Sequence, residues 1–220
     1  MRLTLLVFIL LITAICLAQF DLADFTKFNQ NVNRQYGPQR TLVAQKWQEI
    51  LTQSISLSEL EKLEAINTFF DEVLNYQTDQ ALWKKEDYWA SAVETIGQGS
   101  GDCEDYATLK YFSLRLLGID DAKLRLIYVK AKIGGARSRI TQAHMVLGYY
   151  ATPDSEPLVL DSLISEVLPS SKRKDLIPVF SFNSEGLWSG QSNQLVGNAT
   201  SKLSKWRNLL AKTQEEGIQW

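Results

Sequence analysis

The sequence predicts an α+β fold in which a helix that begins at a cysteine packs on an antiparallel sheet. Three observations support this fold class. Amphipathic helical patterns occupy the N-terminal part of the chain, from Gln19 to about Asn75. A capped helix begins at Cys103, and segments rich in β-branched and aromatic residues follow from Lys123 onward. Helices followed by a run of short strands are typical of the α+β class.

The length of the chain suggests one domain, and its charge bears on which partners it binds. Its 220 residues are 45% hydrophobic, which is enough for a well-buried core. The net charge is −2. We do not expect nucleic acid as a partner, because its binding depends on Lys and Arg clustered against phosphates. The expected organisation is one domain, with or without a small helical lobe.

The first eighteen residues have the pattern of a signal peptide. Arg2 supplies a positive start, Leu3 to Ile15 form an apolar run, and Cys16-Leu17-Ala18 occupy the cleavage positions. Retention of this segment as an anchor is the alternative, but the run is shorter than the roughly 20 apolar residues that span a bilayer. We therefore predict export, a mature chain that begins at Gln19, and no stable membrane anchor.

Two helical stretches precede the cysteine. Ser58 and Glu61 form a capping-box pattern that opens a helix over Leu60 to Leu74, in which apolar residues recur at helical spacing. The segment from Asp24 to Leu51 is also mainly helical, with a break at Gly37-Pro38. The N-terminal part of the mature chain is therefore predicted to be helical.

Cys103 is the only cysteine outside the predicted signal peptide, so it has no partner for an internal disulfide. Asp102 is a good N-cap residue, apolar residues follow at helical spacing, and Gly118 supplies a C-terminal stop. The thiol then lies in the first helical turn, where unpaired N–H groups and the helix dipole favour the thiolate. Two interpretations remain open, namely a reactive nucleophile and a small apolar residue on a buried face.

Three strands are predicted after this helix, over Lys123 to Ala131, Gln142 to Ala151, and Pro157 to Asp161. If the turn between the last two is centred between residues 152 and 153, His144 pairs with Asp161. Paired residues point to the same face with Cβ atoms about 5 Å apart, so the carboxylate can accept the imidazole N–H. A structural histidine and a turn-capping aspartate are the alternatives.

Cys103, His144 and Asp161 together fit the chemistry of a cysteine hydrolase. In such enzymes a thiolate attacks, an imidazole takes and returns the proton, and a carboxylate orients the imidazole. His144 is the only histidine in the chain, as Cys103 is the only cysteine of the mature part. We therefore predict these three as the catalytic residues, in the chain order Cys, His, Asp.

Three carboxylates surround the cysteine, those of Asp102, Glu104 and Asp105. At ~6 Å and an effective dielectric constant of ~20, one carboxylate raises the energy of the thiolate by on the order of 2.8 kcal/mol, or about two pKa units. Two of them outweigh the helix dipole, whereas a bound divalent cation reverses the sign. Clustered carboxylates suit Ca²⁺, although their spacing is not that of an EF-hand. Acids that only stabilise the helix dipole are the alternative.

The residues around the cysteine also resemble a known family. The segment Gly97 to Ala107, preceded by Tyr88-Trp89-Ala90 and Glu94, resembles the bacterial transglutaminase-like cysteine proteinases and, within them, the LapG-type periplasmic proteases. The resemblance extends over roughly Glu59 to Phe182. It implies a papain-like, transglutaminase-like core over residues 76–182, between helical residues 19–75 and a tail over residues 183–220.

The resemblance implies a role for each of the residues described above. Cys103 is then the nucleophile, His144 the general base and acid, and Asp161 its orienter. The implied calcium ligands are Asp102, Glu104 and Asp105. The implied substrate is the N-terminal region of a large repeat adhesin, cut at a di-alanine site so that the cell leaves its biofilm. The implied regulator is a LapD-type inner-membrane cyclic di-GMP receptor.

Some features leave alternatives open. Trp89 is either a core aromatic residue or a substrate-binding wall of the active-site groove. In the tail, Leu203, Trp206 and Leu210 form a stripe that either packs a final helix on the domain or contacts a partner. Two alternative functions also remain, a transglutaminase-type acyltransferase and a non-catalytic binding module of the same fold.

Overall fold

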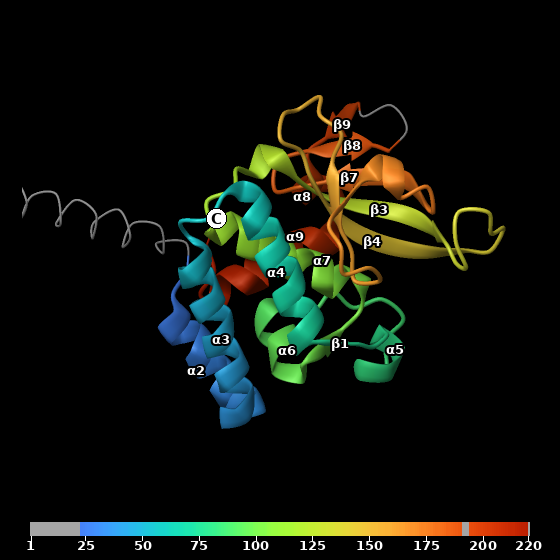
Figure 1. The fold of residues 1–220 in the computed structure, drawn as a ribbon. Helices are drawn as coiled ribbons and strands as arrows, with labels where there is room; N and C mark the ends of the chain where they lie inside the picture. The colour runs from blue at the N-terminus through green and yellow to red at the C-terminus, as the bar shows by residue number, and fades with distance from the viewer. Residues whose placement is uncertain (1–22, 191–193, 220) are drawn as a thin grey trace, which may run out of the picture.

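The computed structural model describes residues 23–190 and 194–219, so the predicted signal peptide lies outside the described residues. Figure 1 shows the described part as a group of helices beside a twisted sheet. The longer helices are α2 (Phe25–Tyr36), α3 (Pro38–Ser54), α4 (Glu59–Val73), α6 (Ala92–Gln98), α7 (Cys103–Leu116) and α9 (Ser204–Glu215). The short ones are α5 (Asp79–Leu82), α8 (Ala199–Lys202) and the 3-10 helices η1 (Asp121–Lys123) and η2 (Ser170–Lys172).

One large sheet carries seven of the strands in the described residues, in the order β6-β5-β4-β3-β7-β8-β9. Its strands are β3 (Leu124–Lys132), β4 (Thr141–Tyr149), β5 (Leu158–Leu160), β6 (Leu168–Pro169), β7 (Leu176–Phe182), β8 (Leu187–Ser189) and β9 (Leu195–Gly197). All neighbouring pairs in it are antiparallel. A small parallel pair joins β1 (Asn75–Tyr76) to β2 (Ser100–Gly101). The predicted α+β class is confirmed.

The three predicted strands correspond to β3, β4 and β5, whereas β6 to β9 are additional. Three of the additional strands are only two or three residues long, too short for an alternating pattern to be recognised. Pro178 interrupts the fourth, β7, where the pairing with β3 also changes register.

Local sequence signals explain where the N-terminal helices begin. The predicted capping box is present at α4, where Ser58 and Glu61 satisfy each other's backbone N–H groups. Asp24 caps α2 by accepting from the N–H of Lys27 at 3.0 Å. Gly37 separates α2 from α3 with a φ of 83°, a conformation that favours glycine. The predicted break between two helices is therefore confirmed.

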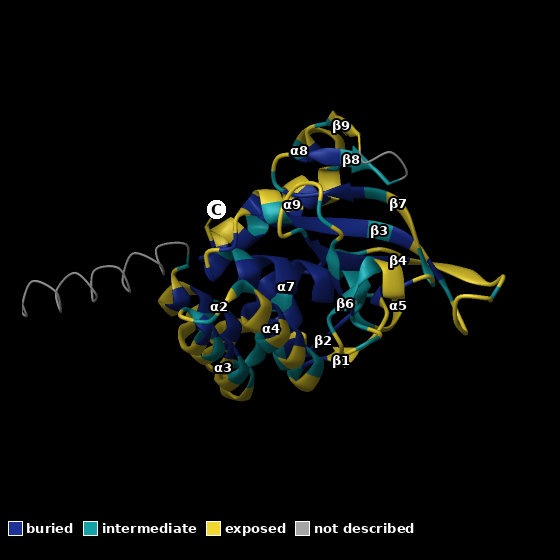
Figure 2. Cartoon of the chain, turned by 45° about the horizontal axis from the view of Figure 1, so that its top comes forward, coloured by how far each residue is buried: buried dark blue, intermediate teal, exposed yellow. Residues whose placement is uncertain are grey.

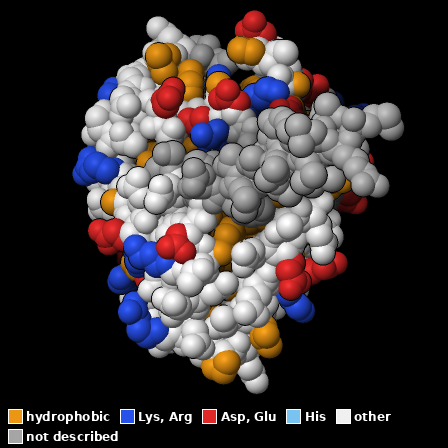
Figure 3. Space-filling model, turned by 90° about the vertical axis from the view of Figure 1, so that its left-hand side faces the viewer, with side chains coloured by type: hydrophobic (Ala, Val, Ile, Leu, Met, Phe, Trp, Pro, Cys, Tyr) orange, Lys and Arg blue, Asp and Glu red, His pale blue; other side chains and the backbone are white. Residues whose placement is uncertain are grey.

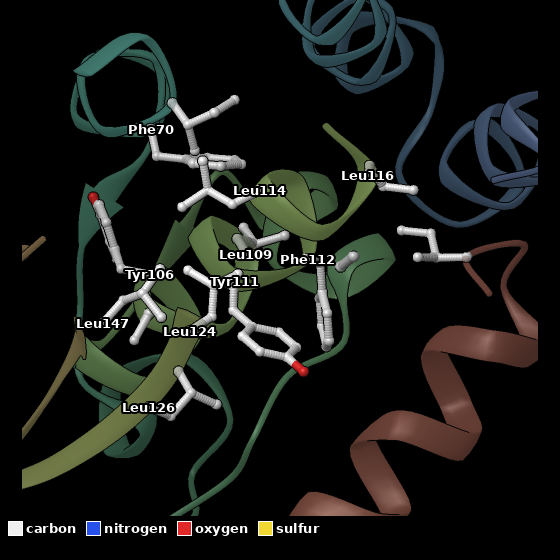
Figure 4. Packing of buried hydrophobic residues seen from close by; sticks show 14 of the residues in the cluster. Phe70, Tyr106, Leu109, Tyr111, Phe112, Leu114, Leu116, Leu124, Leu126 and Leu147 are labelled. Atoms are coloured by element: carbon white, nitrogen blue, oxygen red, sulfur yellow. The ribbon is translucent and has the colours of Figure 1, made fainter. Parts of the chain in front are cut away.

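The helix that begins at the cysteine, α7, lies at the centre of the molecule. It packs on β3 and β4 on one side and on α4 on the other, and Figure 2 shows it almost wholly buried. Figure 4 shows side chains of α7 between Phe70 of α4 and residues of the strands, among them Leu124, Leu126 and Leu147. This packing fixes the N-terminal end of α7 relative to the sheet.

The C-terminal tail belongs to the same core. Trp206 of α9 is fully buried, stacks on Phe112 of α7 with ring centroids 6.1 Å apart, and donates its indole N–H to the carbonyl of Asn183 at 2.9 Å. Leu210 is buried as well. The packing interpretation of the tail stripe is therefore confirmed. Buried core residues extend from Phe25 to Ile218.

Among the described residues, no helix is both long and apolar enough to cross a membrane. On the face that Figure 3 shows, basic and acidic side chains are interspersed. This mixture agrees with the small net charge of the chain.

Candidate functional site

Cys103 is the first residue of α7 and is half-buried. A short, tightly turned segment joins it to the end of α6. Gly99 ends α6 in the left-handed conformation, with a φ of 69°. A Cβ atom at Gly101 would lie 2.7 Å from the Cβ of Asp105, so only glycine leaves room for this carboxylate under the turn. The two glycines therefore allow the chain to turn sharply into the helix and present the thiol at its first turn.

The sulfur of Cys103 lies beside the first part of β4, which β5 does not reach. β5 pairs with β4 only from Leu147 to Tyr149, which leaves the earlier part of β4 without a neighbour on this side. Burial raises the pKa of the thiol there, and the backbone N–H of Met145, which faces the sulfur, opposes part of that rise. The shortness of β5 thus makes room for the N-terminal end of α7 beside β4.

His144 and Asp161 are in direct contact. The Nε2 atom of His144 lies 2.7 Å from Oδ1 of Asp161, and the two residues are 4% and 1% exposed. The predicted contact is therefore present.

The predicted pairing that led to this contact is wrong by two residues. The ladder pairs Leu147 with Leu160 and Tyr149 with Leu158, because the turn closes between Thr152 and Ser155, with Ser155 N–H donating to the Thr152 carbonyl at 3.0 Å. A shift of two residues keeps side chains on the same face, so His144 and Asp161 meet as diagonal neighbours.

The carboxylate of Asp161 is held in its ionised form. Burial alone would raise its pKa, but the hydrogen bonds and charges of His144 and Arg173 lower it to about 2. Nη2 of Arg173 donates to Oδ2 of Asp161 at 2.7 Å, and the N–H of Leu163 donates to Oδ1 at 3.1 Å. Asp161 is thus an acceptor for the imidazole N–H at any ordinary pH.

Cys103 and His144 line the same cavity, which has a volume of about 570 Å³. Its walls include the aromatic side chains of Tyr76, Trp89, Tyr128 and Phe180. Trp89 also stacks on the buried ring of Phe182, with centroids 5.9 Å apart. It therefore lies against the core with one face and borders the cavity with the other, so the two interpretations of Trp89 do not exclude each other.

Carboxylates gather beside the cysteine in a pattern that extends beyond the predicted ligands. Oxygen atoms of Asp79, Asp102 and Asp105 lie within 4.8 Å of one another, and a second group brings together Asp79, Asp87 and Glu104. Asp79, from the start of α5, is the residue that sequence reasoning missed. Nothing in its local sequence distinguishes it from an ordinary helix-start acid, since only the folded chain brings it to Asp102.

The hydrogen bonds of these acids leave ligand oxygens free. Oδ1 of Asp79 and Oδ1 of Asp102 are buried without a hydrogen-bond partner among the described residues. Asp105 is more fully used, since its oxygens accept from the N–H groups of Ala90 at 2.9 Å and of Asp102 at 3.4 Å. Buried, unpaired carboxylate oxygens are costly, and a hard divalent cation would satisfy them. Asp79 and Asp102 therefore fit such a cation, and Glu104 has oxygen atoms near each of them.

The electrostatics of the bare acids oppose a thiolate. Burial and the neighbouring carboxyls of Glu104 and Asp105 raise the pKa of Asp102 to about 9. Burial, followed by Glu104 and Asp102, raises the pKa of the Cys103 thiol, whose sulfur lies 3.0 Å from Oε2 of Glu104. The expectation that these acids disfavour the thiolate agrees with the geometry.

Comparisons with known proteins identify the family to which the chain is similar. Residues 43–177 match the model of the family described as bacterial transglutaminase-like cysteine proteinase. Among solved structures, LapG of Legionella pneumophila is 38% identical to the chain. Its EGTA-treated form aligns with a TM-score of 0.75 over 87% of this chain and 98% of the other. Its calcium-bound form aligns with a TM-score of 0.70 over 84% and 96%. No curated protein sequence matched.

The family match covers the helix that begins at Cys103 and both members of the His144–Asp161 contact. The structural match extends over most of both chains. The resemblance noted from the sequence is therefore confirmed, and the chain belongs to the bacterial transglutaminase-like cysteine proteinases.

Proposed function

We propose that the protein is a calcium-dependent cysteine endopeptidase with Cys103 as its nucleophile, His144 as its general base and acid, and Asp161 as the orienter of the imidazole. The observation that supports these roles best is the 2.7 Å contact between His144 and Asp161 at a cavity that Cys103 also lines. A helix-terminal thiol, an imidazole and a buried carboxylate are the parts that acyl transfer through a thioester needs.

In this proposal the two imidazole nitrogens have different tasks. An ionised carboxylate can only accept a hydrogen bond, so the Nε2 atom beside Asp161 would carry the ring proton and Nδ1 would be the nitrogen that takes the thiol proton of Cys103. The sulfur then attacks the peptide carbonyl, and the backbone N–H of Cys103 at the helix start is a natural donor to the resulting oxyanion. The imidazolium returns the proton to the leaving amine, and water, deprotonated by the same nitrogen, hydrolyses the thioester.

Asp102, Glu104 and Asp79 are the residues that would hold Ca²⁺, with Asp105 behind them in support. When bound, the cation would offset the negative charge that otherwise raises the pKa of the Cys103 thiol. Two observations support calcium. The orphaned oxygens of Asp79 and Asp102 lack any other partner among the described residues, and a calcium-bound structure exists for Legionella LapG.

The substrate proposed for this site is the N-terminal region of a large cell-surface adhesin, cut at a di-alanine site. Cleavage would release the adhesin and promote biofilm dispersal. The protein would reach the periplasm through its N-terminal signal peptide and would be regulated by a LapD-type inner-membrane cyclic di-GMP receptor. Similarity to LapG over most of the chain supports these proposals.

The decisive test is incubation of the calcium-loaded protein with the periplasmic segment of the host's largest repeat adhesin. Mass spectrometry of the products should show two fragments whose new ends lie at the di-alanine site. The Cys103→Ala protein and a segment with the di-alanine replaced should both give no fragments. An uncut segment with the wild-type protein would contradict the proposed substrate.

Acyl transfer to an amine is the second candidate, because transglutaminases use the same three residue types. The same incubation distinguishes the two reactions. Crosslinking of glutamine-containing proteins without release of a shorter fragment would favour transfer over hydrolysis.

A further inference from the structure

The carboxylate of Asp161 is also held by an arginine, at the oxygen that does not contact His144. Its Oδ2 accepts from Nη2 of Arg173 at 2.7 Å, while Oδ1 serves His144 and the N–H of Leu163. The backbone carbonyl of Asp161 also accepts from Nζ of the buried Lys110 at 2.9 Å. Asp161 therefore has a fixed position, and Arg173 is the group that determines where its second oxygen points.

Arg173 is itself locked in place. It is 3% exposed and follows η2 directly. Its Nε donates to Oδ1 of Asp175 at 3.1 Å, and its Nη2 donates to Oδ2 of Asp175 at 2.8 Å. The guanidinium group is planar, and Asp175 binds it at both Nε and Nη2. Its third hydrogen bond, from Nη2 to Asp161, therefore has a nearly fixed direction. Asp175 immediately precedes β7, so the orientation of Asp161 is tied to the sheet.

We propose that Arg173 is a positioning residue that holds the carboxylate of Asp161 in the one orientation that keeps the ring proton on Nε2 of His144. Nδ1 of His144 is then left unprotonated for the Cys103 thiol. This inference rests on the proposed function for its catalytic meaning, but the tautomer of His144 is a property of the fold and can be measured without any activity.

Removal of Arg173 would leave Oδ2 of Asp161 buried and unpaired. The carboxyl would then rotate or take up a proton, because an uncompensated charge in the interior is costly. Besides His144, its other charged neighbours are two acids, Asp71 on α4 and Asp175 before β7, which would add to that cost, and the cation Lys110, which would offset part of it. A protonated carboxyl can donate to the ring, which would favour the Nδ1–H tautomer of His144 and remove the base.

The single histidine of the chain makes the tautomer directly observable. The full mature protein, produced without a polyhistidine tag and labelled with ¹⁵N-histidine, gives one pair of ring nitrogen signals, whose shifts report which nitrogen carries the proton. The measurement uses the Cys103→Ala background, alone and combined with Arg173→Met, Arg173→Lys or Arg125→Met. Arg125 on β3 is a matched control, because it is also a buried arginine but stacks on Trp188 and Tyr150.

The expected result is the Nε2–H tautomer in the Cys103→Ala protein and in its Arg125→Met derivative, and a mixed or Nδ1–H signal after Arg173→Met. With Cys103 present, kcat should fall about tenfold to a hundredfold for Arg173→Met while KM stays within about twofold, since only orientation is lost. Arg173→Lys keeps the positive charge but lacks the paired N–H donors of the guanidinium group, so it should give an intermediate kcat.

An unchanged Nε2–H signal in Arg173→Met, or an Nδ1–H signal in the Cys103→Ala protein itself, would overturn the proposal. If Arg173→Met does not fold, Arg173→Lys decides, and a wild-type signal together with a wild-type kcat counts against the proposal. Failure of the proposed function is distinguishable, because it shows as a wild-type protein that cuts no substrate whatever its tautomer.

Discussion

At the scale of the residue, Cys103 occupies two opposing environments. The helix start and the N–H of Met145 favour its thiolate, whereas burial and the acids on either side disfavour it and prevail. A nucleophile in this position needs a positive charge nearby. The unpaired oxygens of Asp79 and Asp102 show where such a charge could bind.

Replacement of Cys103 by alanine should abolish cleavage and leave the fold intact, because the side chain is half-buried and small. We expect kcat to fall by at least about a thousandfold, as is usual when a nucleophile is removed. Product formation and the thermal unfolding midpoint of the same preparation provide the check. A variant that folds normally and still cuts the substrate would remove Cys103 from the reaction.

Asp161→Asn should reduce kcat by about two to four orders of magnitude with a smaller change in KM, because an amide can favour the wrong tautomer of His144.

The same substitution should alter stability in a pH-dependent way. The folded pKa of Asp161, about 2, lies below its unfolded value, so its contribution of about 2 kcal/mol is present above about pH 4 and is lost as the pH falls toward 2.

Urea unfolding of the wild-type and Asp161→Asn proteins between pH 6 and pH 2 measures that contribution, with Asp154→Asn in the exposed turn as the control. The free energies of unfolding of the wild-type and Asp161→Asn proteins should converge as the pH falls. A difference that stays constant over this range would contradict the role assigned to the ionised carboxylate.

Some of these residues could be predicted from the sequence because they are rare or because they share a short segment. Cys103 is the only cysteine after residue 18 and His144 is the only histidine, and Asp102, Glu104 and Asp105 lie beside the cysteine in the sequence. Arg173 and Asp79 could not, since each is one of many like-charged residues and reaches the site only through the path of the chain.

At the scale of the element, the site depends on how far β5 extends. The strand ends at Leu160, which frees the edge of β4 for α7 and places Asp161 just beyond the ladder, beside His144. The strands and their order along the chain could be predicted from residue patterns. Their register could not, because it depends on which residues close the turn at Thr152–Ser155, and a turn motif allows more than one centre.

The final helix should contribute strongly to stability through one side chain. Trp206→Ala should lower the free energy of unfolding by about 3–5 kcal/mol, because it opens a cavity where Phe112, Phe182 and Tyr111 meet the indole ring. Leu195→Ala, at a residue 60% exposed, is the control and should change it by less than about 0.5 kcal/mol. Urea denaturation gives both values, and equal effects would contradict the packing of α9 into the core.

At the scale of the whole molecule, the acids of the proposed calcium site come from different parts of the chain. Asp79 lies at the start of α5, whereas Asp102 and Glu104 flank the first residue of α7. A shared cation would therefore join α5 to the central helix. Buried core residues extend from Phe25 to Ile218, so we expect the metal to stabilise the fold without being required for it.

Chelation should accordingly lower the thermal unfolding midpoint reversibly. With free Ca²⁺ at about 100 times its dissociation constant, binding adds about 2.7 kcal/mol to the free energy of unfolding. Differential scanning calorimetry in Ca²⁺, in EGTA, and after restoration of Ca²⁺ measures this change, and Asp79→Asn should show a smaller one. An unfolding midpoint that is the same in all three solutions would exclude a calcium site in the folded protein.

The central claim is that the acids beside Cys103 make its reactivity depend on a bound cation. The rate at which iodoacetamide alkylates a protein that begins at Gln19, at neutral pH, tests it most directly, since Cys103 is its only thiol. We predict alkylation at least about tenfold faster in Ca²⁺ than in EGTA, because the cation offsets carboxylates that each cost the thiolate on the order of 2.8 kcal/mol. Equal rates in the two solutions would contradict the account.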